Sequence, residues 1–121
     1  MATALVIDDN RATADSLCKM ISMLGVPAKP AYGARSAILA LNQEVSDIVF
    51  LDINMPGVDG FEVMAYLKRQ PTLRNIPVVI VTSDDQPETA EKARRTGALN
   101  VIVKPVTVEA LERTLKTARL I

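Results

Sequence analysis

The chain has 121 residues, of which 49% are apolar and 23% are charged, a composition typical of one folded globular domain with a buried core. Its 14 basic and 14 acidic residues leave no net charge, so there is no electrostatic footprint for nucleic-acid binding. The absence of His and the presence of a single Cys exclude histidine-based catalysis, a disulfide framework and a cysteine zinc site.

No apolar run approaches the roughly 18 residues of a membrane helix, and the acidic N-terminal segment is unlike a signal peptide. We therefore expect a cytoplasmic protein with no membrane partner. In chain order, the hydrophobic pattern predicts a strand over 4–7, a helix over 14–24, a strand over 26–32, a helix over 34–41, a strand over 48–51, a helix over 61–67, a strand over 77–81, a helix over about 87–96, a strand over 99–103 and a helix over 108–118.

Four of these strands are short runs rich in Val, Ile and Leu, mostly continuous rather than alternating, which is typical of parallel strands that are covered on both faces. The strand over 26–32 contains two prolines, which cannot donate to a neighbouring strand, so we expect it at an edge. Strands and helices alternate five times, so the sequence predicts a single α/β domain over residues 1–121. We expect a five-stranded parallel sheet in the order 2-1-3-4-5, a (βα)5 flavodoxin-like three-layer sandwich.

Several helix details follow from local sequence. Asp59 followed by Glu62 is typical of a capping box at the start of the third helix. Asp84 and Asp85 are expected as N-cap residues of the fourth helix. That helix has only Ala90 and Ala93 on its inner face, whereas the fifth has an apolar stripe of Val108, Leu111, Leu115 and Ala118. Cys18 lies on the apolar stripe of the first helix and is expected in the core.

Polar side chains follow four of the expected strands at their carboxyl ends. Asp8 and Asp9 follow the first strand, Asp52 the third, Thr82 the fourth and Lys104 the fifth. In an open parallel sheet, ligands bind outside these carboxyl ends, where the first and third strands diverge. We therefore expect these side chains to converge on one site.

Three adjacent carboxylates repel one another by about 4 kcal/mol per pair at 4 Å and an effective dielectric near 20. They are tolerated when a cation lies among them. An all-oxygen set of ligands, supplemented by water and a phosphoryl oxygen, favours Mg²⁺. With the Lys104 ammonium and the Thr82 hydroxyl on the other side of the pocket, the set resembles a phosphoryl-transfer site in which an Asp is the acceptor.

The whole chain resembles the receiver domain of two-component response regulators, similar to the small chemotaxis regulators. The matching motifs occur in that family's order: Asp8-Asp9, the run from Leu51 through Asp52-Ile53-Asn54-Met55-Pro56-Gly57 to Gly60, Thr82-Ser83, Gly97-Ala98 and Lys104-Pro105.

The resemblance implies a role for each matched residue. Asp52 would receive a phosphoryl group from a phosphohistidine of a histidine kinase or a histidine phosphotransfer protein. Asp8 and Asp9 would hold Mg²⁺ together with Asp52 and the backbone carbonyl of Asn54. Lys104 would pair with the phosphoryl group.

The resemblance also assigns the phosphoryl oxygens to the Thr82 hydroxyl and the Ser83 N–H. It implies a cis bond between Lys104 and Pro105. Asn54 and Asp84 would tune hydrolysis of the phosphoryl group, with Asp84 facing that group.

One position departs from the family, which usually has Tyr or Phe three residues before the Lys, where this chain has Val101. In the family, this ring normally turns inward upon phosphorylation. Transfer of the phosphoryl group does not need the ring, but the usual way of signalling the phosphorylated state to a partner does. We expect an output partner to bind the face formed by the segments 87–96, 99–103 and 108–118.

Two alternative functions remain. A degenerate receiver would serve only as a constitutive protein-interaction module, although such members usually lose an Asp or the Lys. A small Mg²⁺-dependent phosphatase with an Asp nucleophile would need a second acid where this chain has Asn54. A flavin-binding flavodoxin is disfavoured, because the acidic loop after the first strand would repel a phosphate.

Overall fold

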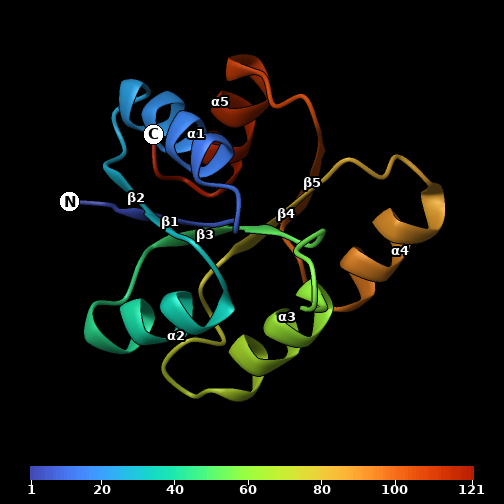
Figure 1. Ribbon diagram of the computed structural model, residues 1–121. Helices are drawn as coiled ribbons and strands as arrows, with labels where there is room; N and C mark the ends of the chain where they lie inside the picture. Colours follow the sequence, from blue (N-terminus) through green and yellow to red (C-terminus); the bar gives the residue numbers. More distant parts are fainter.

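A computed structural model describes residues 1–121 and has the predicted architecture of alternating strands and helices (Figure 1). The elements are β1 (Ala4–Ile7), α1 (Arg11–Met23), β2 (Ala28–Ala31), α2 (Ala34–Gln43), β3 (Ile48–Asp52), α3 (Gly60–Arg69), β4 (Val78–Thr82), α4 (Pro87–Arg95), β5 (Asn100–Val103) and α5 (Val108–Thr117). All neighbouring strands are parallel, in the order β2-β1-β3-β4-β5. The predicted fold and strand order are confirmed.

Two apolar cores lie on opposite faces of the sheet. One face packs against α2, α3 and α4, and the other packs against α1 and α5 (Figure 1). Residues of β1, β3 and β4 alternate between the two cores, so these strands are buried on both sides. Cys18 lies in the second core as expected, and burial raises the pKa of its thiol to about 11.

The two edge strands behave differently from the centre of the sheet. Pro30 lies in β2, which is an edge strand as predicted. β5 is the other edge. Val101 packs half-buried against one core and Ile102 is buried in the other, while Val103 is exposed. The expectation that this strand is covered on both faces is therefore met only in part, because the helices cover the edge of the sheet incompletely.

Three expectations about the helices need correction. Ala90 and Val108 are exposed, so the inner face of α4 contributes only Ala93 to the core and α5 relies on Leu111, Thr114 and Leu115. The N-cap of α4 is Gln86 rather than either preceding Asp, because the helix begins at Pro87 as predicted and the N-cap is the residue directly before it.

The start of α3 agrees with the sequence in part. Asp59 is its N-cap and accepts a hydrogen bond from the Phe61 N–H at 2.9 Å. The N–H of Glu62 donates to the Asp59 carbonyl, while no reciprocal side-chain bond from Glu62 forms, so the capping box is incomplete. No helix of the structure combines the length and the apolar character needed to cross a bilayer.

The loop from β3 to α3 requires a glycine at its end. A Cβ added at Gly60 would lie 2.5 Å from the Ile53 Cα, which is backbone and cannot swing away. We expect Gly60→Ala to lower the free energy of unfolding by about 1–3 kcal/mol, although Ala is intrinsically the better helix former. Urea unfolding measures this, with Ser36→Ala on the exposed side of α2 as the control. Unchanged stability would show that the loop moves freely.

Candidate functional site

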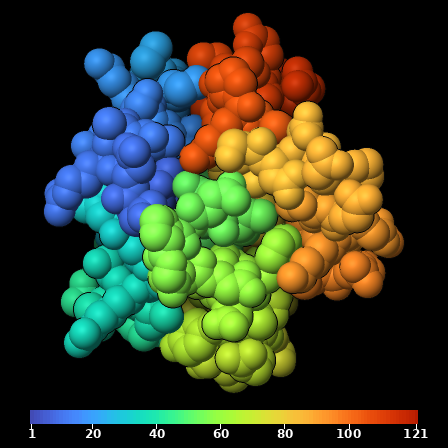
Figure 2. Space-filling model, turned by 45° about the vertical axis from the view of Figure 1, so that its right-hand side comes forward, coloured from blue at the N-terminus to red at the C-terminus, as the bar shows by residue number.

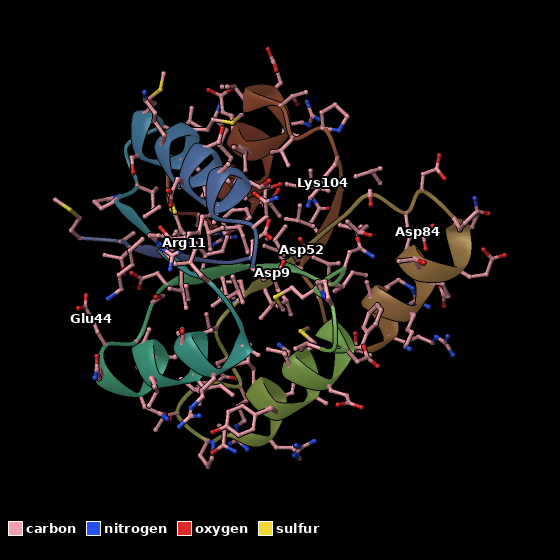
Figure 3. All side chains as sticks on the ribbon, in the orientation of Figure 1. Asp9, Arg11, Glu44, Asp52, Asp84 and Lys104 are labelled. Carbon is pink, nitrogen blue, oxygen red and sulfur yellow. The ribbon has the colours of Figure 1, made fainter.

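The strand register brings the predicted polar residues together. Ile7 lies opposite Leu51, so Asp8 and Asp52 are neighbours at the carboxyl ends of β1 and β3. Thr82 ends β4 opposite Val103, and Lys104 follows directly. Asp9, Asp52 and Lys104 lie close together in the middle of the molecule, whereas Asp84 lies beside α4 (Figure 3).

Three carboxylates form the centre of the site. One oxygen from each of Asp8, Asp9 and Asp52 lies within 4.8 Å of the others. Asp8 and Asp52 are buried, with 3% and 5% of their surface exposed, while Asp9 is exposed. Together with Asn10, Thr13, Asn54, Pro56 and Lys104, they line an open cavity of about 390 Å³. This all-oxygen donor set fits a hard divalent cation such as Mg²⁺.

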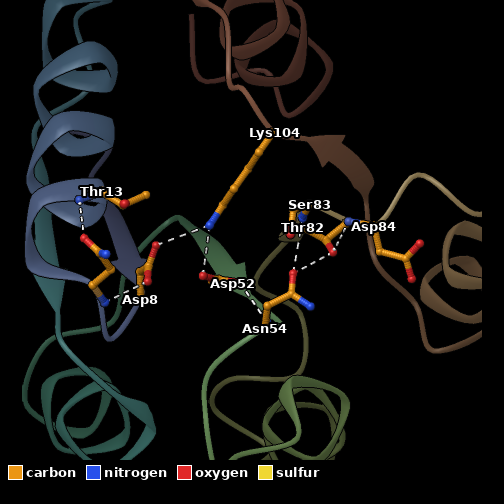
Figure 4. Close-up of polar contacts among 9 residues, drawn as sticks. Asp8, Thr13, Asp52, Asn54, Thr82, Ser83, Asp84 and Lys104 are labelled. Atoms are coloured by element: carbon orange, nitrogen blue, oxygen red, sulfur yellow. Dashed lines mark hydrogen bonds and ion pairs between the residues drawn. The ribbon is translucent and has the colours of Figure 1, made fainter.

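Lys104 is the cation of the cluster. Its Nζ lies 3.1 Å from Asp52 Oδ2 and 3.8 Å from Asp8 Oδ2 (Figure 4). The contact with Asp8 was not predicted, because it depends on how far the Lys104 side chain reaches from the end of β5 across β4 and β3 toward β1. The Lys104–Pro105 peptide bond is cis, as the resemblance implied.

Backbone N–H groups orient the two buried carboxylates. The Asn54 N–H donates to Asp52 Oδ1 at 2.8 Å, and the Asn10 N–H donates to Asp8 Oδ1 at 2.9 Å. Asn10 is also the N-cap of α1 and accepts a hydrogen bond from the Thr13 N–H. This cap was not predicted, although an Asn just before a helical pattern is a recognised N-cap signal.

A second group of hydrogen bonds joins β3 to β4 beside the acidic pocket. The Thr82 hydroxyl donates to the Asn54 side-chain oxygen at 2.8 Å, and the Ser83 N–H donates to the same oxygen at 3.2 Å. The Asp84 N–H donates to the Thr82 hydroxyl oxygen at 3.0 Å. Figure 4 shows Asn54 between Asp52 and Thr82.

Asp84 does not face the acidic pocket, contrary to the expectation from the sequence. Its carboxylate accepts hydrogen bonds from the Gln86 N–H at 2.9 Å and the Thr89 hydroxyl at 2.5 Å, in the first turn of α4. The hydrogen bond from Thr89, followed by that from Gln86, holds the pKa of Asp84 below its usual value.

The acidic cluster changes the pKa of one of its members, Asp8. Burial raises the pKa of Asp8, and the nearby Asp52 adds to this shift, while the Asn10 N–H and Lys104 oppose it. The folded protein therefore binds a proton on the Asp8 carboxylate more tightly than the unfolded chain does. Without a divalent ion, the free energy of unfolding should decrease as the pH rises through the pKa of Asp8.

We expect the Mg²⁺ affinity to fall as the pH drops from about 8 to about 5, because protons compete with the ion for the Asp8 carboxylate, whose pKa is raised. Titrations with Mg²⁺ at several pH values, followed through the amide signals of Asn10 and Asn54, measure this dependence. An affinity that does not change over that pH range would contradict a carboxylate-held ion.

Comparison with known proteins agrees with this geometry. A family model described as the response regulator receiver domain matches residues 4–116. The chain belongs to this family. Receiver domains are phosphorylatable signalling switches rather than conventional enzymes, they generally use Mg²⁺ at an acidic pocket, and histidine kinases or phosphotransfer proteins phosphorylate them.

Several relatives of this receiver domain are similar over its length. Protein PilH of Pseudomonas aeruginosa is 33% identical over 115 residues, which cover 95% of each chain. The phosphate regulon regulatory protein PhoB of Escherichia coli is 30% identical over 93% of this chain, which spans about half (49%) of PhoB. The chemotaxis protein CheY4 of Vibrio cholerae has a TM-score of 0.90 at 26% identity, with 98% of each chain covered.

Proposed function

We propose that this receiver domain is a Mg²⁺-dependent switch that accepts a phosphoryl group on Asp52. The observation that carries the proposal is the Lys104 ammonium, 3.1 Å from the buried Asp52 carboxylate within a cluster of three carboxylates. A degenerate interaction module would have no need to keep this costly arrangement, because two buried like charges are tolerated only with a cation between them.

Each side chain has a role in the proposed reaction. Asp8, Asp9, Asp52 and the Asn54 backbone carbonyl would hold Mg²⁺, which would neutralise charge on the transferred phosphoryl group. An Asp52 oxygen forms a bond to phosphorus as the bond from phosphorus to the donor histidine nitrogen breaks, and the histidine keeps that electron pair. The Lys104 ammonium, which pairs with the Asp52 carboxylate in the unmodified protein, would pair with the phosphoryl oxygens after the transfer.

Two further donors would bind the phosphoryl oxygens. They are the Thr82 hydroxyl and the Ser83 N–H, which already point toward the pocket side of β4 and engage the Asn54 side chain. Asn54 has a carboxamide where an aspartate-dependent phosphatase would need an acid, and this favours a stable switch over that enzyme.

We propose that the partner is a histidine kinase or a histidine phosphotransfer protein that approaches over α1 and the segment after β5. There the acidic pocket continues into a second cavity of about 350 Å³, lined by Ala12, Ser16 and Met20 of α1 and by Pro105 and Val106. An apolar helix face could dock at this rim and bring a phosphohistidine to Asp52. Figure 2 shows α1 and α5 close to the loop after β3 on this face.

The test uses two small phosphodonors, acetyl phosphate and phosphoramidate, the latter with the phosphorus–nitrogen bond of phosphohistidine. We expect a mass increase of about 80 Da with Mg²⁺ and none with EDTA, because the added phosphoryl charge needs the divalent ion. A modification that forms equally well in EDTA, or no modification by either donor, would contradict the proposed function.

The output surface is proposed to be the face formed by α4, β5 and α5. Only Ala93 of α4 is buried, and a small side chain contributes little burial energy, about 0.8 kcal/mol per CH₂ group. A weakly anchored helix is easily shifted by a local change of charge. Val101 is half-buried against the core and has neither a polar group nor a ring to reposition.

We therefore expect beryllofluoride with Mg²⁺ to produce large amide shifts over residues 83–97 and small ones at Val101. Backbone NMR measures both in one experiment. The amides of α2 serve as an internal control, because α2 packs near β2, at the opposite edge of the sheet from α4 and β5. Shifts that are confined to Asp8, Asp9 and Asp52, with α4 unchanged, would place the output on another face.

A further inference from the structure

The Asn54 side chain accepts hydrogen bonds from the same two donors that, in the proposed function, bind the phosphoryl oxygens. A single oxygen, Asn54 Oδ1, accepts from both the Thr82 hydroxyl at 2.8 Å and the Ser83 N–H at 3.2 Å (Figure 4). The Thr82 side chain is fully buried, and its hydroxyl has one proton to donate. Asn54 and a phosphoryl oxygen therefore cannot both receive that proton.

The same hydroxyl is connected to α4. Thr82 Oγ1 accepts from the Asp84 N–H at 3.0 Å, which constrains the direction of its own proton. The Asp84 carboxylate holds the Gln86 N–H and the Thr89 hydroxyl, as described above. Hydrogen bonds thus run without a break from Asn54 through Thr82 and Asp84 to the first turn of α4.

We propose that the Asn54 carboxamide is an internal competitor of the phosphoryl group. It holds the Thr82 hydroxyl and the Ser83 N–H while Asp52 is unmodified, and it gives them up when a phosphoryl oxygen arrives. Release of Thr82 then loosens the bond to Asp84 and allows the start of α4 to move. The inference rests on the proposed function and adds the mechanism by which the unmodified state is maintained.

The exchange is favourable because the incoming acceptor is stronger. Hydrogen bonds to a charged oxygen are roughly twice as strong as those to a neutral carboxamide oxygen. The cost of the exchange is the loss of two neutral bonds at Asn54, a side chain at an exposed position where water can replace them. Asn54 therefore raises the threshold for the switch without blocking it, which suits a side chain that faces the pocket from the adjoining loop.

The test compares Asn54→Ala with the wild-type domain and with the matched control Asn42→Ala. Asn42 is exposed near the end of α2 and does not line the acidic cavity. Beryllofluoride is titrated in saturating Mg²⁺ and followed by amide NMR. We expect Asn54→Ala to bind beryllofluoride about fivefold more tightly or better, because a competing bond is removed, and Asn42→Ala to bind like the wild type.

A second measurement reports on the unmodified protein. Without beryllofluoride, the Ser83 amide hydrogen should exchange with solvent about fivefold faster in Asn54→Ala, because its acceptor is missing. The Mg²⁺ affinity should not change, because the proposed ligand at this position is the backbone carbonyl. Asn54 is exposed, so the variant should fold, and its amide spectrum verifies this directly.

The outcomes separate the two proposals. If the wild-type domain itself binds no beryllofluoride in Mg²⁺, the proposed function is wrong. If the wild type binds but Asn54→Ala binds equally or more weakly, the competitor role is overturned while the proposed function stands. Unchanged exchange at Ser83 would likewise overturn it, because the carboxamide would then not be holding that donor in solution.

Discussion

Asp52→Asn should abolish the mass increase of about 80 Da that acetyl phosphate and Mg²⁺ produce in the wild-type domain. An amide is not a nucleophile toward phosphorus. Asp8 is also buried with an N–H on one oxygen, but the Lys104 ammonium lies closer to Asp52, at 3.1 Å against 3.8 Å. Intact-mass spectrometry after a fixed incubation measures the modified fraction.

Asp47→Asn is the matched control for this substitution. Asp47 precedes β3, whereas Asp52 ends it, so the two residues lie at opposite ends of one strand. Asp47 is exposed and accepts only the Thr3 N–H, which an Asn can still satisfy. We expect normal modification of this control. A modified species that survives Asp52→Asn would show that another side chain is the acceptor.

Lys104→Ala should slow phosphorylation by acetyl phosphate on the order of 100-fold or more, because removal of one preorganised charge at a transition state has this effect in other enzymes. Mg²⁺ binding should persist and even strengthen. The Lys104 ammonium lies within 4 Å of two proposed ligands, Asp8 and Asp52, so it competes with the ion for their charge. The beryllofluoride-induced shifts in α4 should be lost.

The control for this prediction is Lys29→Ala, which removes an exposed ion pair with Glu44 at the other side of the molecule. Such surface pairs contribute about 0–1 kcal/mol, so stability and phosphorylation should stay close to wild type. Mg²⁺ titration and the rate of modification are measured on the same samples. Loss of Mg²⁺ binding in Lys104→Ala would mean that the lysine organises the metal site and does not face the anion.

The architecture was predictable because buried strands and amphipathic helices each have a characteristic spacing of apolar residues, which can be read directly in the sequence. The buried runs of β1, β3 and β4 and the proline in β2 indicate which strands are central and which is an edge. Convergence of Asp8, Asp52 and Lys104 followed from topology alone, because the carboxyl ends of parallel strands share one side of the sheet. The neighbouring register of β1 and β3 supports that reasoning.

Local capping was predicted less well than topology. Asp84 was expected to be an N-cap of α4, but the N-cap is Gln86, two residues later. The Asp84 carboxylate instead accepts a hydrogen bond from the Thr89 hydroxyl inside the helix. Ala90 was expected to be buried, but α4 turns it outward and leaves Ala93 as its sole buried side chain. Both outcomes depend on the angle at which the helix leaves the loop, which helical periodicity does not encode.

The sequence by itself determined the fold, the order of the strands and the membership of the acidic cluster, because these depend on periodicity and on residue types at strand ends. Only the tertiary structure decided the pairing of the polar atoms. The bond from Thr82 to Asn54 joins residues 28 positions apart, and Lys104 lies 52 positions from Asp52. Such contacts depend on side-chain direction and on sub-ångström approach between loops. A one-dimensional pattern carries neither, so the hydrogen-bonded connection from Asn54 to α4 appears only when the chain is folded.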